Sequence, residues 1–141
     1  MTGKTTLKKQ REIKRQWYLF DAKKYVLGRL STRVARLLTG KQHVDYTPNV
    51  DMGDFVVIVN APKIIFTGRK LDQKKYHSFS GYPGGIRTVS LKTMLSTNPE
   101  RVIYEAVRNM LPKNKLRAKQ LRRLKILKTD AHKFKIDKNM D

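Results

Sequence analysis

Runs of apolar residues along the chain predict a small set of buried strands. Trp17 to Phe20 is a short aromatic and apolar run that suits a first strand. The β-branched run from Phe55 to Val59 is typical of a central strand whose two faces are both buried. A shorter run, Ile64 to Phe66, is a further strand candidate. We expect a last short strand around Ile126 and Leu127.

Two segments carry apolar residues at helical spacing. From Leu27 the apolar positions recur every three or four residues, and Gly40 is typical of the residue that ends a helix. A second helix should begin with Asn98 as its N-cap and Pro99 in its first turn, and should end before Pro112. Strands separated by a helix indicate a parallel α/β sheet with a right-handed crossover.

Three polar segments complete the pattern. Glycines and a proline at 81–85 interrupt the polar stretch 69–92, which predicts an exposed loop or hairpin. Residues 1–16 are basic and hold few large apolar residues, so we expect an arm that is mobile when free. The tail at 129–141 has no clear periodicity. We therefore divide the chain into this arm, a single domain over 17–128 and this tail.

The most basic segment lies near the C-terminus. Residues 113–128 contain eight basic residues, and no acid occurs between Glu105 and Asp130. Three leucines are spaced roughly for one helical face: Leu116, Leu121 and Leu124. We therefore predict an amphipathic basic helix with Arg122 and Arg123 away from the leucine face. On this assignment, replacing both arginines by alanine should weaken nucleic-acid binding with little loss of fold.

The charge balance indicates an anionic partner. The 141 residues include 32 Lys and Arg against 11 Asp and Glu, a formal net charge of +21, which opposes a compact fold unless a polyanion neutralises it. The longest strongly apolar run is far shorter than the ~20 residues that span a bilayer. The first sixteen residues lack the apolar stretch of a secretory signal, and there is no cysteine. We expect a cytoplasmic protein that binds nucleic acid rather than a membrane.

Catalytic signatures are weak. The first strand does not lead into the Gly-x-Gly-x-x-Gly turn of dinucleotide-binding proteins, and no phosphate-binding P-loop motif occurs. A nuclease-like metal site is the best enzymatic alternative, because four potential ligands lie close in sequence: His43, Asp45, Asp51 and Asp54. Aspartates in a loop also commonly cap turns, which is the more ordinary interpretation.

Short motifs follow one another in a fixed order over most of the chain. They are Trp17-Tyr18 with Asp21-Ala22, Leu27-Gly28-Arg29-Leu30, Tyr46-Thr47-Pro48, Asp51 with Gly53-Asp54, Asn60-Ala61 with Lys63, Thr67-Gly68, Ser80-Gly81-Tyr82-Pro83-Gly84-Gly85, Glu100-Arg101-Val102-Ile103 and Met110-Leu111-Pro112-Lys113. Each motif is weak alone, but together they are specific. From about Trp17 to about Lys128 the chain resembles the large-subunit ribosomal protein L-thirteen family.

This resemblance implies a three-layer, Rossmann-like α/β/α fold around a small, mainly parallel sheet. It also implies a structural protein that binds large-subunit ribosomal RNA, joins early in assembly and adjoins other large-subunit ribosomal proteins. No enzymatic activity, cofactor, metal or small-molecule substrate is implied. The resemblance makes Asp51, Gly53 and Asp54 a turn before the second strand. It places the 81–85 loop in an extension that faces RNA.

We predict RNA contacts at basic residues and at interleaved aromatic ones. Lysine and arginine position phosphates, and aromatic rings can stack on unpaired bases. The candidates are Lys8, Lys9, Arg11, Lys14, Arg15, Arg29, Arg33, Arg36, Arg69, Lys70, Lys74, Lys75, Tyr76, His77, Tyr82, Arg87, Lys113, Lys115, Arg117, Lys119, Arg122, Arg123, Lys125 and Lys128. Two alternatives stay open: the α-helical arginines could form an ordinary solvated face, and the tyrosines could only pack the loop.

Overall fold

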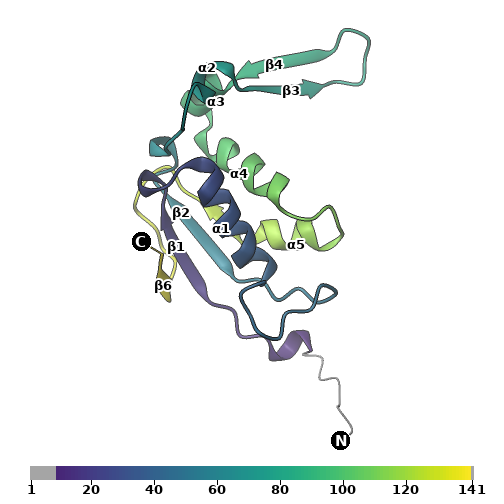
Figure 1. Ribbon diagram of the computed structural model, residues 1–141, viewed down its shortest axis with the longest axis vertical. Helices are drawn as coiled ribbons and strands as arrows, with labels where there is room; N and C mark the ends of the chain where they lie inside the picture. Colours follow the sequence, from purple (N-terminus) through teal and green to yellow (C-terminus); the bar gives the residue numbers. More distant parts are fainter. Residues whose placement is uncertain (1–8, 141) are drawn as a thin grey trace, which may run out of the picture.

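A four-stranded parallel sheet forms the centre of the protein. The computed structural model describes residues 9–140 (Figure 1). The strands are β1 (Trp17–Asp21), β2 (Phe55–Val59), β5 (Leu124–Ile126) and β6 (Lys138–Asn139), in the order β5-β2-β1-β6. Each neighbouring pair is parallel. The predicted α/β fold with a mainly parallel central sheet is confirmed.

Two amphipathic helices pack against this sheet and against each other. Helix α1 (Leu27–Thr39) ends at Gly40, whose φ of 81° lies in the left-handed region that favours glycine. Helix α4 (Pro99–Met110) begins after Asn98, whose side chain accepts a hydrogen bond from the Arg101 amide at 3.3 Å. The predicted start and end of both helices are therefore confirmed.

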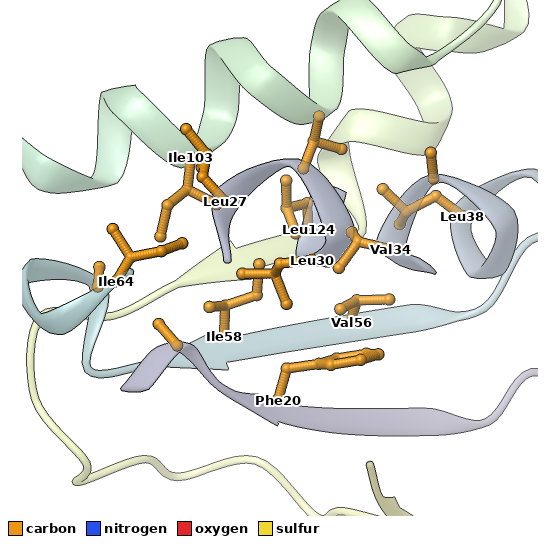
Figure 2. Packing of buried hydrophobic residues seen from close by; sticks show 14 of the residues in the cluster. Phe20, Leu27, Leu30, Val34, Leu38, Val56, Ile58, Ile64, Ile103 and Leu124 are labelled. Atoms are coloured by element: carbon orange, nitrogen blue, oxygen red, sulfur yellow. The ribbon is translucent and has the colours of Figure 1, made fainter. Parts of the chain in front are cut away.

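Alternation along the strands divides the buried residues between the two faces of the sheet. Phe20 and Val56 point toward the helices, where Figure 2 shows them below Leu30 and Val34. Phe20, Leu30, Val34 and Val56 are fully buried. Full burial of side chains of this kind contributes about 1.5–3 kcal/mol each. The apolar stripe of α1 is therefore what fixes the helix to the sheet.

The C-terminal tail contacts the opposite face and the β1 edge. Trp17 lies on the face of β1 opposite to that of Phe20, because successive side chains of a strand point to opposite faces. Its ring stacks on Phe134 of the tail with 5.2 Å between ring centroids. The Trp17 amide donates to Asp137 at 2.8 Å, and β6 then pairs with β1. A two-residue strand is too short to produce a periodic pattern, which explains why the sequence of the tail showed none.

An antiparallel hairpin projects away from the sheet (Figure 1). Strands β3 (Lys75–Phe79) and β4 (Ile86–Ser90) pair along their whole length, and the turn between them holds the glycine cluster. Short helices α2 (Lys70–Gln73) and α3 (Leu91–Thr97) connect the hairpin to the body of the protein. The predicted exposed hairpin is therefore present.

Two predicted details are wrong. Ile64 to Phe66 do not form a strand, and only Ile65 makes an isolated parallel bridge, with Val26. The preceding Asn60 has a left-handed φ of 57° and leads into a 3₁₀ turn over Ala61–Lys63, so the chain leaves the sheet. The basic helix α5 (Leu116–Arg122) is shorter than predicted, because Leu124 already begins β5. Two further 3₁₀ turns are η1 (Gln10–Glu12) and η2 (Ala22–Lys24).

Candidate nucleic-acid interface

Most of the predicted RNA-contact residues are exposed. The exposed ones are Lys9, Arg11, Lys14, Arg29, Arg33, Arg36, Arg69, Lys70, Lys75, His77, Tyr82, Arg87, Lys113, Lys115, Lys119, Arg122, Lys125 and Lys128. Arg15, Lys74, Tyr76 and Arg117 are half-buried, and Arg123 is buried. Lys8 lies outside the described residues. The structure therefore leaves most of the predicted cations open to an anionic partner.

The arginines of α1 form one outward face. Arg29, Arg33 and Arg36 are exposed, whereas the apolar stripe of the same helix is buried. The Arg33 guanidinium lies 5.2 Å from the centroid of the Tyr25 ring and donates to its hydroxyl at 3.3 Å. A cation held against a ring in this way is positioned without being neutralised, so its charge is still available to a phosphate.

The hairpin carries basic residues where it joins the body of the protein and apolar residues at its tip. Near its base, the Lys74 ammonium lies 5.2 Å from the centroid of the Tyr76 ring. At its tip, Phe79, Tyr82 and Ile86 are 67%, 76% and 66% exposed. The cross-strand pair of Phe79 and Ile86 thus presents apolar surface to solvent next to the glycine turn. An exposed apolar patch of this kind is typical of a contact surface.

The two candidate tyrosines differ in their surroundings. Tyr76 packs against the apolar core cluster, and burial, followed by the nearby Glu105 carboxylate, raises the pKa of its phenol. The phenol is therefore neutral at physiological pH. Tyr82 is instead exposed at the tip. The packing interpretation fits Tyr76, and Tyr82 is the tyrosine whose ring is open to a partner.

The N-terminal arm and α5 meet at a basic hollow. The hollow has a volume of about 610 Å³ and is lined by Ile13, Arg15, Asp51, Lys119, Arg122 and Arg123. These residues come from three segments that are far apart in sequence. The fold therefore joins two of the predicted basic segments, the arm and the C-terminal one, into a single surface.

Arg123 is a structural residue, and its predicted place on an exposed helix face is wrong. Its guanidinium is buried and pairs with both carboxylate oxygens of Asp51 at 2.5 Å, and it also donates to the Leu38 carbonyl at 3.2 Å. The prediction extended helical periodicity beyond Arg122, where α5 ends. Once the chain turns toward β5, the side chain of Arg123 points inward rather than to solvent.

Gly53 is required by the same arrangement. A Cβ atom at this position would lie 1.7 Å from the Leu38 carbonyl oxygen and 2.7 Å from the Arg123 guanidinium. Only a residue without a side chain can pass this close to the helix end and the arginine. The motif Asp51 with Gly53-Asp54 is thus a closely packed loop segment that receives Arg123.

The loop aspartates are held by separate partners rather than gathered as metal ligands. Asp51 pairs with Arg123, whereas the buried Asp54 accepts from the backbone N–H of Gln16 and lies 3.0 Å from Nε2 of His43. Asp54 also accepts from the Gln42 amide group. Within residues 9–140, no three histidine or acidic side chains come together in a way that could hold a metal ion.

Comparison with known proteins identifies the family. The model of the family described as Ribosomal protein L13 matches residues 15–133. The chain belongs to the ribosomal protein L13 family. It is 50% identical over 135 residues to large ribosomal subunit protein uL13 of Thermotoga petrophila, covering 96% of this chain and 91% of that protein.

Other members of the L13 family match over a similar length. The uL13 protein of Thermoanaerobacter pseudethanolicus is 47% identical over 96% of this chain and 94% of its own length. That of Pelobacter propionicus is 50% identical over 92% of this chain and 91% of its own length. The resemblance inferred from short motifs is therefore confirmed. Along the described part of this L13 chain, no helix has the length and apolarity to cross a bilayer.

Two basic residues of this L13 chain were missed by sequence reasoning. Arg101 and Arg108 are exposed on α4 and line a cleft of about 550 Å³ beside the hairpin, together with Lys74 and Lys75. Arg108 also pairs with Glu105 at 3.3 Å. Both arginines fall away from the apolar stripe of α4, which is a signal of exposure. Their nearness to the hairpin has no such signal, because it depends on how the hairpin packs beside this helix.

Proposed function

We propose that this chain is a structural constituent of the large ribosomal subunit, where it binds large-subunit ribosomal RNA through phosphate contacts and supports early assembly. The observation that carries the proposal is the spread of exposed cations over the arm, α1, the hairpin and α5. An RNA that folds around the protein can reach all of these elements, whereas a small substrate would need one convergent site. Phosphate contacts fix position and register without reading sequence.

The names of the relatives support a place in the large ribosomal subunit. The uL13 proteins of Thermotoga petrophila and Thermoanaerobacter pseudethanolicus are named as proteins of the large ribosomal subunit. We infer that this chain occupies the corresponding place in cytoplasmic ribosomes, beside other large-subunit proteins. The exposed apolar tip of the hairpin suits such a crowded setting, because a partner would remove it from water.

Two rival functions use the same charge. One is an RNA-modifying or RNA-cleaving enzyme, and the other is a DNA-compacting protein, since phosphate contacts carry no sequence information. The buried loop aspartates argue against the first, because Asp51 is occupied by Arg123 and Asp54 by its hydrogen bonds to Gln16 and Gln42. The second differs from our proposal in the nucleic acid that it prefers.

Binding to folded large-subunit ribosomal RNA and to duplex DNA of equal length, at the same salt concentration, tests the proposal. We expect the ribosomal RNA to bind at least about tenfold more tightly, a difference of about 1.4 kcal/mol. Sedimentation in a cell lysate should place the protein with large subunits. Equal affinity for the two nucleic acids would overturn the ribosomal assignment and favour DNA compaction.

Tyr82 offers a test of stacking at the hairpin tip. Replacing it by alanine should weaken binding to ribosomal RNA by about 1–3 kcal/mol, the range for loss of one base-stacking ring. Tyr82→Phe keeps the ring and should bind like the wild type. Because Tyr82 is exposed, neither change should alter thermal unfolding. Equal binding by Tyr82→Ala and the wild type would assign the tip to another partner.

A further inference from the structure

We propose that the hollow between the N-terminal arm and α5 is a defined seat for one phosphate group. This inference rests on the proposed function and makes it local, because it names the place where an RNA phosphate is held. Arg15 of the arm and Lys119 and Arg122 of α5 stand around the hollow, and Arg123 lines it from within the fold. The ligand is a phosphate oxyanion, either in an RNA backbone or free.

The charge balance in the hollow favours an anion. Four cationic side chains surround one carboxylate, that of Asp51. Arg123 already pairs with both oxygens of this carboxylate, so its negative charge is compensated inside the protein. The charges of Lys119 and Arg122 are exposed above it. Like charges that converge on one hollow repel each other, and an oxyanion placed between them removes that repulsion.

One of the side chains that line the hollow, that of Arg123, also has an unsatisfied donor. Both terminal nitrogens of the Arg123 guanidinium are used by Asp51 and Leu38, but its Nε is buried without a hydrogen-bond partner among the described residues. A guanidinium carries only donors, so the missing partner must be an acceptor. A buried donor without an acceptor is costly. Because this nitrogen is buried, a phosphate oxygen would reach it only after the Arg123 side chain shifts, so the exposed cations Lys119 and Arg122 carry the recognition.

Arg15, which also lines the hollow, is held in position by contacts within the protein. Arg15 donates to the Asp51 carbonyl at 3.2 Å and lies 3.8 Å from its carboxylate, with 30% of its side chain exposed. The backbone N–H of Gln16 donates to Asp54 at 3.0 Å, which ties the next residue of the arm to the same loop. An arginine held in this way loses less conformational freedom on binding than a free one. These contacts distinguish a built seat from a diffuse basic surface.

Thermal unfolding of the full chain in inorganic phosphate tests the seat. Ionic strength is held constant with chloride, so that general screening does not change. The wild type should show a saturable rise in Tm as phosphate replaces chloride. The Lys119→Gln, Arg122→Gln variant should lose that saturable rise. Both side chains are exposed, so the variant is expected to fold.

A matched control removes two charges elsewhere. Lys92 and Lys133 are exposed and lie outside the hollow, so Lys92→Gln, Lys133→Gln should keep the saturable rise. If phosphate raises Tm equally in the wild type, the seat variant and the control, the effect is that of an adventitious ion only. The seat would then be wrong, while the ribosomal proposal would stand on its preference for RNA over DNA.

Binding to ribosomal RNA distinguishes the two sources of phosphate. If an RNA phosphate occupies the seat, the log-log salt dependence of binding should become shallower in the Lys119→Gln, Arg122→Gln variant, by about 1 for each phosphate that the variant no longer neutralises. A saturable rise in Tm with an unchanged RNA slope would assign the seat to free phosphate and overturn the RNA part. Failure to prefer ribosomal RNA over DNA would overturn the proposed function without touching the phosphate titration.

Discussion

Replacing Arg123 by alanine should lower the free energy of unfolding by about 3–5 kcal/mol, the range for removing one partner of a buried ion pair. The change leaves the Asp51 carboxylate buried without its bidentate partner, and the Leu38 carbonyl also loses a donor. Arg15, 3.8 Å from the same carboxylate, remains as a weaker partner, so we expect a loss at the lower end of this range. Urea unfolding measures the difference.

The neighbouring arginine is the matched control for this prediction. Arg122 is exposed, so Arg122→Ala should change the free energy of unfolding by no more than about 0.5 kcal/mol. A double-mutant cycle with Asp51→Asn isolates the pair, because the second change removes the charge that Arg123 compensates. Equal stability of Arg123→Ala and Arg122→Ala would show that the Arg123 to Asp51 pair contributes nothing measurable.

The affinity for ribosomal RNA should fall on the order of 10³ to 10⁵ between about 50 and 200 mM salt, if about six to ten phosphates are contacted. The arm, α1, the hairpin and α5 supply exposed cations in sufficient number for that many contacts. Each phosphate that is neutralised releases condensed counterions, and added salt opposes this release. Filter binding or fluorescence anisotropy over a salt series gives the slope.

Two features of the salt series make it decisive. The slope should be steep for the wild type and should become shallower when exposed cations of α1 are removed, for example by Arg29→Gln with Arg36→Gln. The buried apolar stripe of α1 is untouched by these changes, so thermal unfolding should stay the same. An affinity that does not depend on salt would exclude phosphate contacts as the main source of binding.

Local signals in the sequence were strong where the structure is locally determined. Gly40 and Asn98 mark helix ends because left-handed backbone and side-chain capping depend on one residue and its near neighbours. The run Phe55–Val59 is correctly predicted as a buried strand, because both of its faces are covered. The prediction for Ile64 to Phe66 failed, since the turn at Asn60 redirects the chain in a way that apolar periodicity does not reveal.

For the basic segments too, the sequence predicts one part of the structure and only the tertiary contacts decide the other. Their exposure follows from charge, because ionised side chains are costly to bury without a partner. Arg123 is the exception, since Asp51, far away in sequence, supplies the partner that permits burial. No local pattern distinguishes Arg123 from the exposed Arg122.

The family, the parallel α/β class and the ends of both long helices all follow from the amino-acid sequence alone, and its charge predicts an anionic partner. These properties depend on composition, short motifs and periodicity, which are all local. Folding in three dimensions was needed to place Arg123 inside the protein, to return the tail to β1, and to bring the arm against α5 around a basic hollow. Each of these depends on contacts between distant segments, and such contacts exist only once the chain has packed.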